Sequence, residues 1–221
     1  MTVLVIAPHP DDEILGCGGT IAKRAAAGDE VWVCIVTEGA PPVYEPDFAK
    51  MEAKEMRAAH RKIGVAHVVS LKYPATAIDT VSQRLLNDSL SELVDRLQPN
   101  EVFIPHIGDI HRDHQIVAEA AMVACRPNKK HRIKRVLSYE VLSETDWNIP
   151  NASNAFIPTV YEDISNYIVT KCEAMREYQS QIQDYPSARS YVGIQGLALH
   201  RGVVVGVEAA EAFVLIREVV E

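Results

Sequence analysis

The stretch VLVIAPHPDDEILG, residues 3–16, is the starting point for assigning the fold. Its first five residues, 3–7, are apolar and mostly β-branched, which predicts a short buried strand that stops at Pro8. From Ile14 the apolar residues recur with helical spacing, which predicts a helix up to Ala27. A histidine and three consecutive carboxylates lie between the strand and the helix. A strand, a polar turn and a helix in this order are typical of an α/β protein.

The same alternation continues along the rest of the chain. We expect further strands at 31–37, 68–71, 101–105, 135–139 and 212–217, and further helices at 49–63, 81–97, 114–125 and 164–183. Strands separated by helices imply a mostly parallel sheet with right-handed crossovers. Residues 148–158 are expected to form a polar loop, and 187–199 give no clear signal. Because no repeat or linker interrupts the pattern, residues 1–221 are predicted to form a single α/β domain, a Rossmann-like three-layer sandwich.

The composition narrows the classes of function. The chain has 221 residues, of which 48% are hydrophobic, and a net charge of −8 without a long run of Lys or Arg. Such a chain is a poor partner for nucleic acid or for an anionic membrane surface. No apolar run is long enough to cross a bilayer, and the N-terminus lacks a signal-peptide pattern. Four scattered cysteines without a CxxC pair indicate reduced, buried thiols and a cytoplasmic protein.

The first polar segment, residues 9–13, follows the first strand directly. His9 and Asp12 are three residues apart, so a turn that enters a helix could aim both side chains inward and leave Asp11 free to handle a proton. Neighbouring carboxylates raise one another's pKa, and a dication would remove that cost. The alternative is helix capping, in which the acidic residues complement the N-terminal dipole of the next helix.

The second polar segment is HIGDIHRDH, residues 106–114, which follows the strand predicted at 101–105. Ligands bind beyond the carboxyl ends of the strands in an open α/β sheet, so the two segments are expected to meet. Imidazole and carboxylate suit zinc, and a catalytic zinc commonly takes three protein ligands. A histidine from this segment would complete that set. Among the other histidines, His60 and His131 lie among charged residues and are expected at the surface.

The paired motifs HPDDE, residues 9–13, and HRDH, residues 111–114, resemble those of the PIG-L/LmbE-like family of zinc-dependent N-acetylglucosaminyl deacetylases. The resemblance implies an LmbE-like α/β fold and a metal-dependent N-deacetylase, a hydrolase of linear amide C–N bonds. Its substrate would be a small molecule, an N-acetylglucosamine-like amino sugar or its conjugate. Members of the family often assemble, so a homo-oligomer stays an open alternative.

The resemblance also implies roles for individual residues. The ligands of one catalytic Zn²⁺ would be His9, Asp12 and His114, although iron, cobalt or manganese suits the same donors. Asp11 would be the general base that takes a proton from the attacking water.

Other roles concern the groups around the reacting amide. By the same resemblance, His111 in its protonated form would lie near the developing oxyanion, and Asp113 would support it. Arg135 and Tyr191 fall where related proteins place groups that contact the substrate.

The chain departs from the family's pattern one turn before Glu55. Family members often carry an arginine there, whereas this chain has Glu52. The cations that would replace the arginine are Lys50, Lys54 or Arg57. The sequence therefore leaves the group attached to the amino sugar open.

Three other classes of protein are alternatives to the deacetylase. A catalytically idle metal- or sugar-binding protein would have no use for Asp11. A metal-dependent phosphoesterase would need more bridging carboxylates near the two motifs. A dinucleotide-binding oxidoreductase would need a glycine at position 21, where this chain has Ile21.

Overall fold

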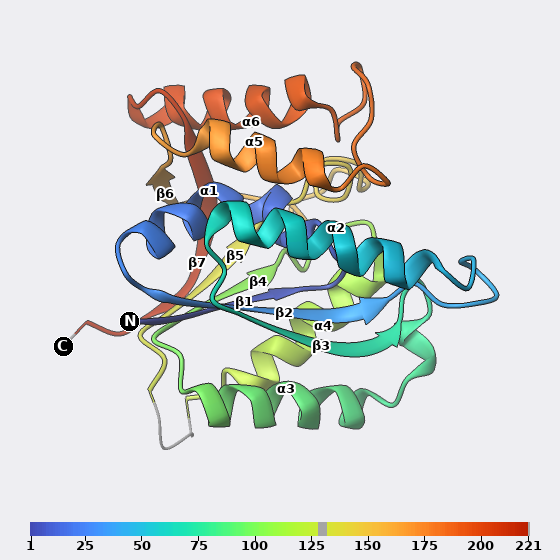
Figure 1. The fold of residues 1–221 in the computed structure, drawn as a ribbon. Coiled ribbons are helices and arrows are strands. Elements are labelled where there is room, and N and C mark those ends of the chain that lie inside the picture. The colour runs from blue at the N-terminus through green and yellow to red at the C-terminus, as the bar shows by residue number, and fades with distance from the viewer. Residues whose placement is uncertain (128–131, 221) are drawn as a thin grey trace.

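The computed structural model describes residues 1–127 and 132–220, in which seven strands form one sheet in the order β3-β2-β1-β4-β5-β7-β6 (Figure 1). The strands are β1 (Thr2–Ala7), β2 (Glu30–Glu38), β3 (His67–Pro74), β4 (Glu101–Pro105), β5 (Arg135–Tyr139), β6 (Val160–Asp163) and β7 (Ala210–Glu218). The strands β1 to β5 are parallel, whereas β7 runs antiparallel to both β5 and β6. The predicted α/β fold with a mostly parallel sheet is confirmed.

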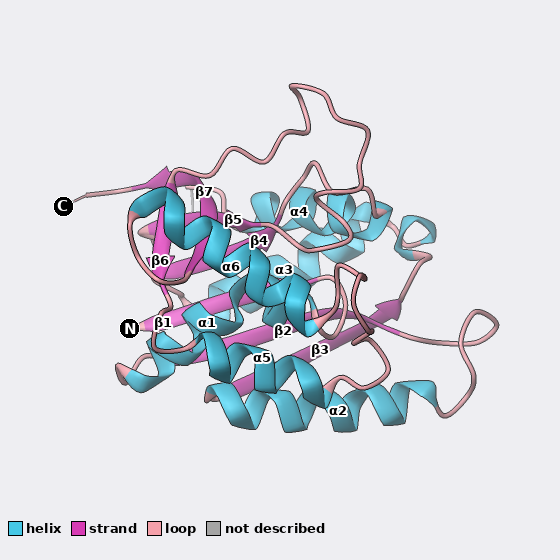
Figure 2. Ribbon diagram, turned by 90° about the horizontal axis from the view of Figure 1, so that it is seen from above, coloured by secondary structure: helices cyan, strands magenta, loops and turns pink. Residues whose placement is uncertain are grey.

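Helices cover both faces of the sheet and give the molecule three layers, which Figure 1 shows from the side and Figure 2 from above. They are α1 (Asp12–Ala26), α2 (Phe48–Ile63), α3 (Gln83–Leu97), α4 (Arg112–Ala124), α5 (Ile168–Glu177) and α6 (Tyr191–Val205), with a 3₁₀ turn, η1 (Ile78–Thr80), before α3. The helices α1, α2, α5 and α6 lie over one face, and α3 and α4 lie over the other.

The two-sided cover explains the sequence of β1. Val3 and Val5 belong to the core under α1 and α2, whereas Leu4 and Ile6 belong to the core under α3 and α4. A strand that is buried on both faces is apolar at every position rather than at alternate positions. The continuous apolar run in residues 3–7 is therefore a consequence of the central place of β1 in the sheet.

The carboxyl ends of β1 and β4 position the polar segments. The two strands are parallel neighbours, although β2 and β3 separate them along the chain. From β1 the chain crosses to β2 on one side, while β4 lies on the other side of β1. Open α/β sheets bind ligands where the strand order reverses in this way.

The second half of the chain differs more from the predicted elements. The strand β6 was not expected, because its four residues are only partly buried and carry no clear apolar pattern. The helix predicted at 164–183 is wrong in length, since α5 ends before Tyr178, whose hydroxyl bonds to a buried carboxylate. The segment without a clear signal contains the start of α6, which holds Gly193, Gly196 and Gly202. Glycine lowers helix propensity and hid this helix.

Two further expectations concern membrane-spanning segments and the cysteines. No helix within the described residues is long and apolar enough to cross a membrane. All four cysteines are buried thiols that form no disulfide, as their scattered spacing predicted.

Candidate metal centre

The first polar turn is fixed by the neighbouring strand. The carbonyl oxygen of Pro8 accepts hydrogen bonds from the backbone N–H of Thr37 at 3.0 Å and from its hydroxyl at 2.8 Å. Four residues later the chain enters α1 at Asp12, whose Oδ2 accepts the backbone N–H of His9 at 2.9 Å. This bond holds the side chains of His9 and Asp12 close together.

The second polar segment is arranged by the start of α4. His111 caps the helix, and its Nδ1 accepts the backbone N–H of Asp113 at 3.1 Å. His114 lies in the first turn and is fully buried. Its Nδ1 contacts Asp109 Oδ2 at 2.8 Å, so its Nε2 is left to face the first segment.

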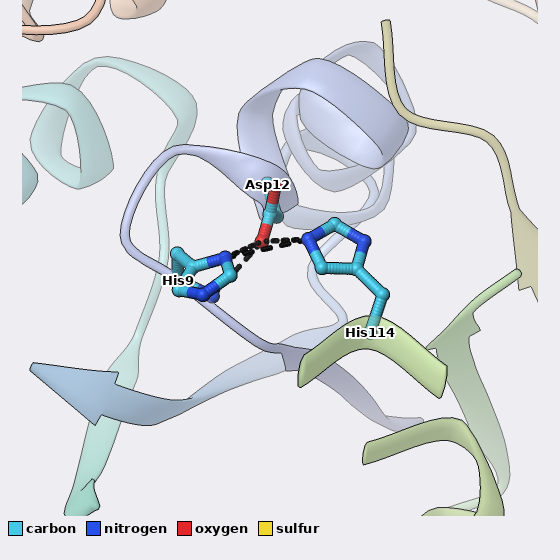
Figure 3. Close-up of side chains that lie close together, drawn as sticks. All are labelled: His9, Asp12 and His114. Atoms are coloured by element: carbon cyan, nitrogen blue, oxygen red, sulfur yellow. Dashed lines mark hydrogen bonds and ion pairs between the residues drawn. The ribbon is translucent and has the colours of Figure 1, made fainter. Parts of the chain in front are cut away.

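Three ligand atoms from the two segments form a small triangle (Figure 3). His9 Nδ1 and His114 Nε2 each lie 3.2 Å from Asp12 Oδ2 and 3.3 Å from one another. Ligands of a tetrahedral zinc, each about 2.0–2.1 Å from the ion, are separated by about 3.3 Å. The second oxygen of Asp12, Oδ1, is buried and has no hydrogen-bond partner among the described residues. The three side chains therefore fit a zinc ion in spacing and in donor type.

The pKa values of His9, Asp12 and His114 indicate that this cluster lacks positive charge. Burial alone would lower the pKa of His114, but the charge of Asp12 and the hydrogen bond to Asp109 outweigh it and raise the pKa to about 10. Burial likewise opposes protonation of His9, yet hydrogen bonds to Asp113 and Asp12 raise its pKa to about 9. Burial would raise the pKa of Asp12, whereas the charge of His114 holds it well below its usual range. Protons on two imidazoles thus supply charge that a dication would supply.

A further carboxylate orients the His114 ring from behind. Asp109 Oδ2 contacts the His114 ring, and Asp109 Oδ1 accepts the hydroxyl of Thr145 at 2.6 Å. A carboxylate in this position fixes the tautomer of a metal-binding imidazole. The sequence placed Asp109 in the motif without giving it a role.

Asp113 lies in the same cluster but contacts a different histidine from the one expected. Its Oδ2 lies 3.0 Å from His9 Nε2 and accepts the backbone N–H of Thr76 at 2.7 Å. Only its backbone N–H reaches His111. The resemblance implies that Asp113 supports His111. In the structure the Asp113 carboxylate contacts the His9 ring instead.

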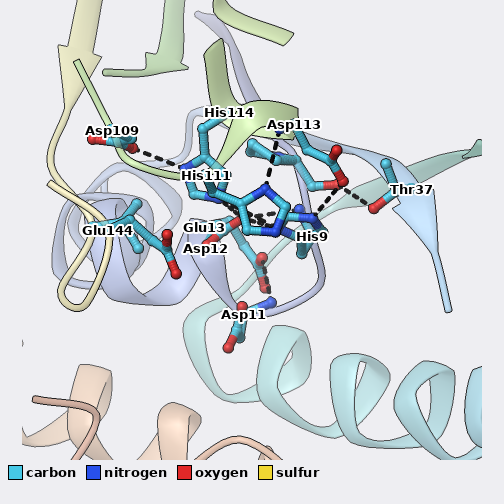
Figure 4. Close-up of polar contacts among 12 residues, drawn as sticks. His9, Asp11, Asp12, Glu13, Thr37, Asp109, His111, Asp113, His114 and Glu144 are labelled. Atoms are coloured by element: carbon cyan, nitrogen blue, oxygen red, sulfur yellow. Dashed lines mark hydrogen bonds and ion pairs between the residues drawn. The ribbon is translucent and has the colours of Figure 1, made fainter. Parts of the chain in front are cut away.

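Asp11 lies beside the ligands in an unusual backbone conformation (Figure 4). Its φ of 113° is in the left-handed region, and its N–H donates to Glu13 Oε2 at 3.1 Å. Its carboxylate is buried and accepts a hydrogen bond from Arg189 Nη1 at 2.9 Å. Burial raises the pKa of Asp11 well above its usual range, although the Arg189 charge opposes this. Strained backbone of this kind is concentrated at functional sites.

The carboxylate of Glu13 takes no part in the triangle. It accepts hydrogen bonds from Tyr178 at 2.7 Å and lies 2.9 Å from His60 Nε2. His60 is buried at 3% exposure, so its predicted place at the surface is wrong. Its spacing from Met56 and Ile63 would have indicated the inner face of α2. His131, predicted at the surface as well, lies outside the described residues.

His111 is a neutral imidazole next to the ligands. Its ring centroid lies 4.6 Å from that of His9. Burial and the positive charge of His9 lower the pKa of His111 to about 4. Because its Nδ1 accepts the backbone N–H of Asp113, the neutral ring carries its proton on Nε2 and can donate it. The geometry thus favours a neutral donor over the protonated ring expected from the resemblance.

A cavity of about 120 Å³ opens next to this cluster. His9, Asp11 and His111 form its chemically active side. The remaining wall is made by side chains from α2, from the loop before it and from the second half of the chain: Tyr44, Phe48, Glu52, Glu144, Gln181 and Arg189.

The structure does not bring Arg135 and Tyr191 into this cavity. Arg135 begins β5, at the opposite end of the sheet, where it pairs with Glu101 at 2.9 Å and Glu218 at 3.1 Å. The ring of Tyr191 packs under the Arg176 guanidinium, 4.5 Å away. The expectation of substrate contact at these two positions is not supported by where their side chains lie.

The cation that does reach the cavity is Arg189, which the sequence did not single out. It lies in the connection between α5 and α6 and reaches Asp11 because α5 packs against α1 (Figure 1). Nothing in the local pattern of residues 187–199 indicates this contact, since it depends on the packing of distant elements.

Comparison with known proteins gives consistent results. The family described as PIG-L: GlcNAc-PI de-N-acetylase matches residues 4–125. The uncharacterized deacetylase YaiS of Escherichia coli is 30% identical over 187 residues, which are 80% of this chain and 90% of YaiS. A probable N-acetyl-alpha-D-glucosaminyl L-malate deacetylase 2 of Bacillus subtilis is 26% identical over 191 residues, 82% of this chain and 83% of that protein.

A solved structure supports the same fold. A conserved protein of Thermus thermophilus superposes with a TM-score of 0.79 at 28% identity, and the match covers 99% of this chain and 96% of that one. Both ligand segments lie inside the part of the chain that the family matches.

Proposed function

Because the chain belongs to the PIG-L family of de-N-acetylases, we propose that it is a zinc-dependent hydrolase that removes the N-acetyl group from an N-acetylglucosamine conjugate. The observation that carries this proposal is the triangle of His9, Asp12 and His114, which lacks positive charge and adjoins a cavity. The Bacillus subtilis relative, a probable N-acetyl-alpha-D-glucosaminyl L-malate deacetylase, supports the same substrate class.

The proposed ligands of the ion are His9 Nδ1, one oxygen of Asp12 and His114 Nε2. Bound zinc would act as a Lewis acid that activates water and polarises the amide carbonyl. The second group of candidate ligands, His9, His111 and Asp113, shares His9 with the first. No carboxylate is common to these two groups of described residues, so they offer no bridging carboxylate of the kind that a two-metal phosphoesterase needs.

Asp11 is the proposed general base. Its carboxylate lines the cavity next to the proposed ligands and accepts the proton of the attacking water. The hydrogen bond from Arg189 Nη1 orients the carboxylate, and its positive charge favours the ionised form that a base requires. An idle binding protein would gain nothing from a buried, strained aspartate at this position.

His111 is the proposed donor to the oxyanion of the tetrahedral intermediate. Its Nε2–H would donate to the former carbonyl oxygen as negative charge develops there. When the C–N bond breaks, the proton held by Asp11 passes to the leaving nitrogen. Asp11 returns to its ionised form, and the remaining proton of the acetic acid passes to the amine, so the products are acetate and an ammonium group.

The proposal is tested by acetate release from a panel of N-acetylated amino sugars, measured with the zinc-loaded protein and with Asp11→Asn. The expected result is release by the parent protein, and loss of release with retention of zinc in the variant. Equal release by Asp11→Asn would rule out the assigned base. A protein that binds no zinc would contradict the whole proposal.

A further inference from the structure

The wall of the cavity contains a carboxylate that the proposed reaction does not use. Glu52, in the second turn of α2, is 7% exposed and lines the cavity together with His9 and Asp11. Its carboxylate accepts a hydrogen bond from the backbone N–H of Gly39. Within residues 1–127 and 132–220, no Lys, Arg or His forms an ion pair with it.

The one arginine in the cavity wall is already committed to other acceptors. Arg189 donates through Nη1 to Asp11 and Gln181, and through Nη2 to Glu144. Its Nε donates to the hydroxyl of Ser143 at 2.9 Å. The charge of Arg189 is thus shared between two other carboxylates, and Glu52, which feels the charge of His9, has no ion pair among the described residues.

The nearby cations of α2 do not compensate Glu52 either. Lys50, Lys54 and Arg57 are exposed on the outer side of the helix, so none of them lines the cavity next to Glu52. Burial raises the pKa of Glu52 to about 7, although the backbone of Gly39 opposes this. A buried carboxylate with one backbone donor is under-satisfied, and a charged donor from a ligand would stabilise it.

We propose that Glu52 binds a free ammonium group of the substrate, so that the cavity selects an amino-sugar conjugate with an unacetylated amine and rejects one with a phosphate or carboxylate. This inference rests on the proposed function, since it names the substrate class of that site. The cavity of about 120 Å³ is smaller than a typical ligand pocket of about 300–1,000 Å³. It encloses the acetamido group and its near surroundings, so the selected amine is close to the reacting amide.

Binding of two disaccharides that cannot release acetate tests the inference without turnover. The probes are chitobiosamine, which carries two amines, and cellobiose, which carries none, titrated calorimetrically into zinc-loaded protein near pH 6.5. We expect chitobiosamine to bind about 10- to 100-fold more tightly than cellobiose, as for a charged hydrogen bond. Glu52→Gln should remove this preference. Glu45→Gln, which removes the same charge from an exposed loop residue, should keep it.

Acetate release then tests selection during turnover. Monoacetylated chitobiose, N,N′-diacetylchitobiose and N-acetylglucosaminyl malate are cationic, neutral and anionic substrates. The parent protein should prefer them in that order by kcat/KM, and Glu52→Gln should bring the three values together.

The two proposals fail in different ways. If Glu52→Gln keeps the preference for chitobiosamine, or if the parent protein shows none, the role of Glu52 is wrong even when acetate is released. If the preference depends on Glu52 but no substrate releases acetate, the deacetylase proposal is wrong and the amine site stands. Circular dichroism of both variants identifies a loss that is due to unfolding.

Discussion

Two buried clusters of charged side chains lie at opposite ends of the sheet. At the amino ends of the strands, Glu101 lies 2.9 Å from Arg135 and 3.1 Å from Arg24, and Arg24 also reaches Glu162 at 2.9 Å. At the carboxyl ends, Asp12 and its neighbouring carboxylates face imidazoles. An imidazole with the ordinary pKa of about 6.5 is mostly neutral above pH 7, so it is not a permanent cation. Both clusters are rich in acid. The described residues of the carboxyl-end cluster include one permanent cation, Arg189, which pairs with Asp11 and Glu144 and leaves the carboxylates around the imidazoles without one.

The difference separates a structural cluster from a functional one. Each carboxylate of the amino-end cluster forms an ion pair with an arginine, so the cluster balances its charge within the protein and joins α1 to three strands. The carboxyl-end cluster reaches neutrality only by binding protons or a metal ion. The pair Lys171–Glu211, at 2.6 Å, is a second complete case: it is buried, and it fastens α5 to β7. Each prediction below changes one cluster and leaves the other intact.

The largest expected effect comes from removing a ligand. Asp12→Ala or His114→Ala should abolish zinc binding, because two remaining ligands hold the ion poorly, and acetate release should fall by at least about 10⁴-fold. Metal analysis after gel filtration and an acetate assay measure the two losses. Retention of one zinc per chain by both variants would contradict the ligand assignment.

A change at Asp11 should separate chemistry from metal binding within the same cluster. Asp11→Asn is expected to retain zinc and to lower kcat by about 10²–10⁴-fold, the usual contribution of a general base. The measurement is kcat together with zinc content for the same preparation. A loss of zinc in parallel with kcat would assign Asp11 to the metal rather than to proton transfer.

His111 should have a smaller effect. His111→Ala removes an N–H donor but no proposed ligand, so zinc content should be unchanged and kcat should fall by about 10²–10³-fold. His111→Gln, which keeps a donor, serves as the matched variant and should recover part of the rate. If the two variants are equally slow, the donor role is not supported.

A substitution in the amino-end cluster should affect stability alone. Arg135→Ala leaves Glu101 paired with Arg24, so we expect a loss of about 1–2 kcal/mol in the free energy of unfolding. Zinc content and kcat per folded molecule should not change. Urea unfolding measures the free energy of unfolding. A reduced kcat in fully folded Arg135→Ala would indicate that Arg135 contacts the substrate after all.

The smallest effect concerns pH. The pKa values of His9 and His114, about 9 and 10, lie above the ordinary 6.5, so the metal-free folded protein binds these protons more tightly than the unfolded chain does. That stabilisation is complete below about pH 6.5 and is lost as the pH rises through 9 to 10. The Tm of metal-free protein should fall by several degrees between pH 7 and 10. Zinc-loaded protein, with unprotonated imidazoles, should fall less in the same scan.

The sequence predicted the parallel half of the molecule well because its signals are local. The bounds of β4 and β5 agree with prediction, and those of β1 differ by one residue. The proposed ligands His9, Asp12 and His114 meet because each motif follows one of two neighbouring strands.

The errors arise where a side chain depends on distant packing. Arg189 lies in the connection between α5 and α6, and its guanidinium donates to Asp11, which is far away in the sequence. No local pattern near Arg189 predicts that contact. Arg135 was given a role from its position relative to the family, although the first residue of a strand lies at the end remote from the site. His60 was judged by its charged neighbours in sequence rather than by the face of the helix that it shares with Met56.

The left-handed conformation of Asp11 has a consequence for attempts to engineer the chain. A non-glycine residue at φ 113° with a buried carboxylate is unfavourable on both counts, so glycine at this position should make the protein more heat-resistant. Selection of a random library for survival at high temperature alone would therefore enrich inactive clones at position 11. Thermal selection would favour glycine at position 11, whereas selection for acetate release would favour aspartate. Positions at which the two selections give different residues would be candidates for functional residues.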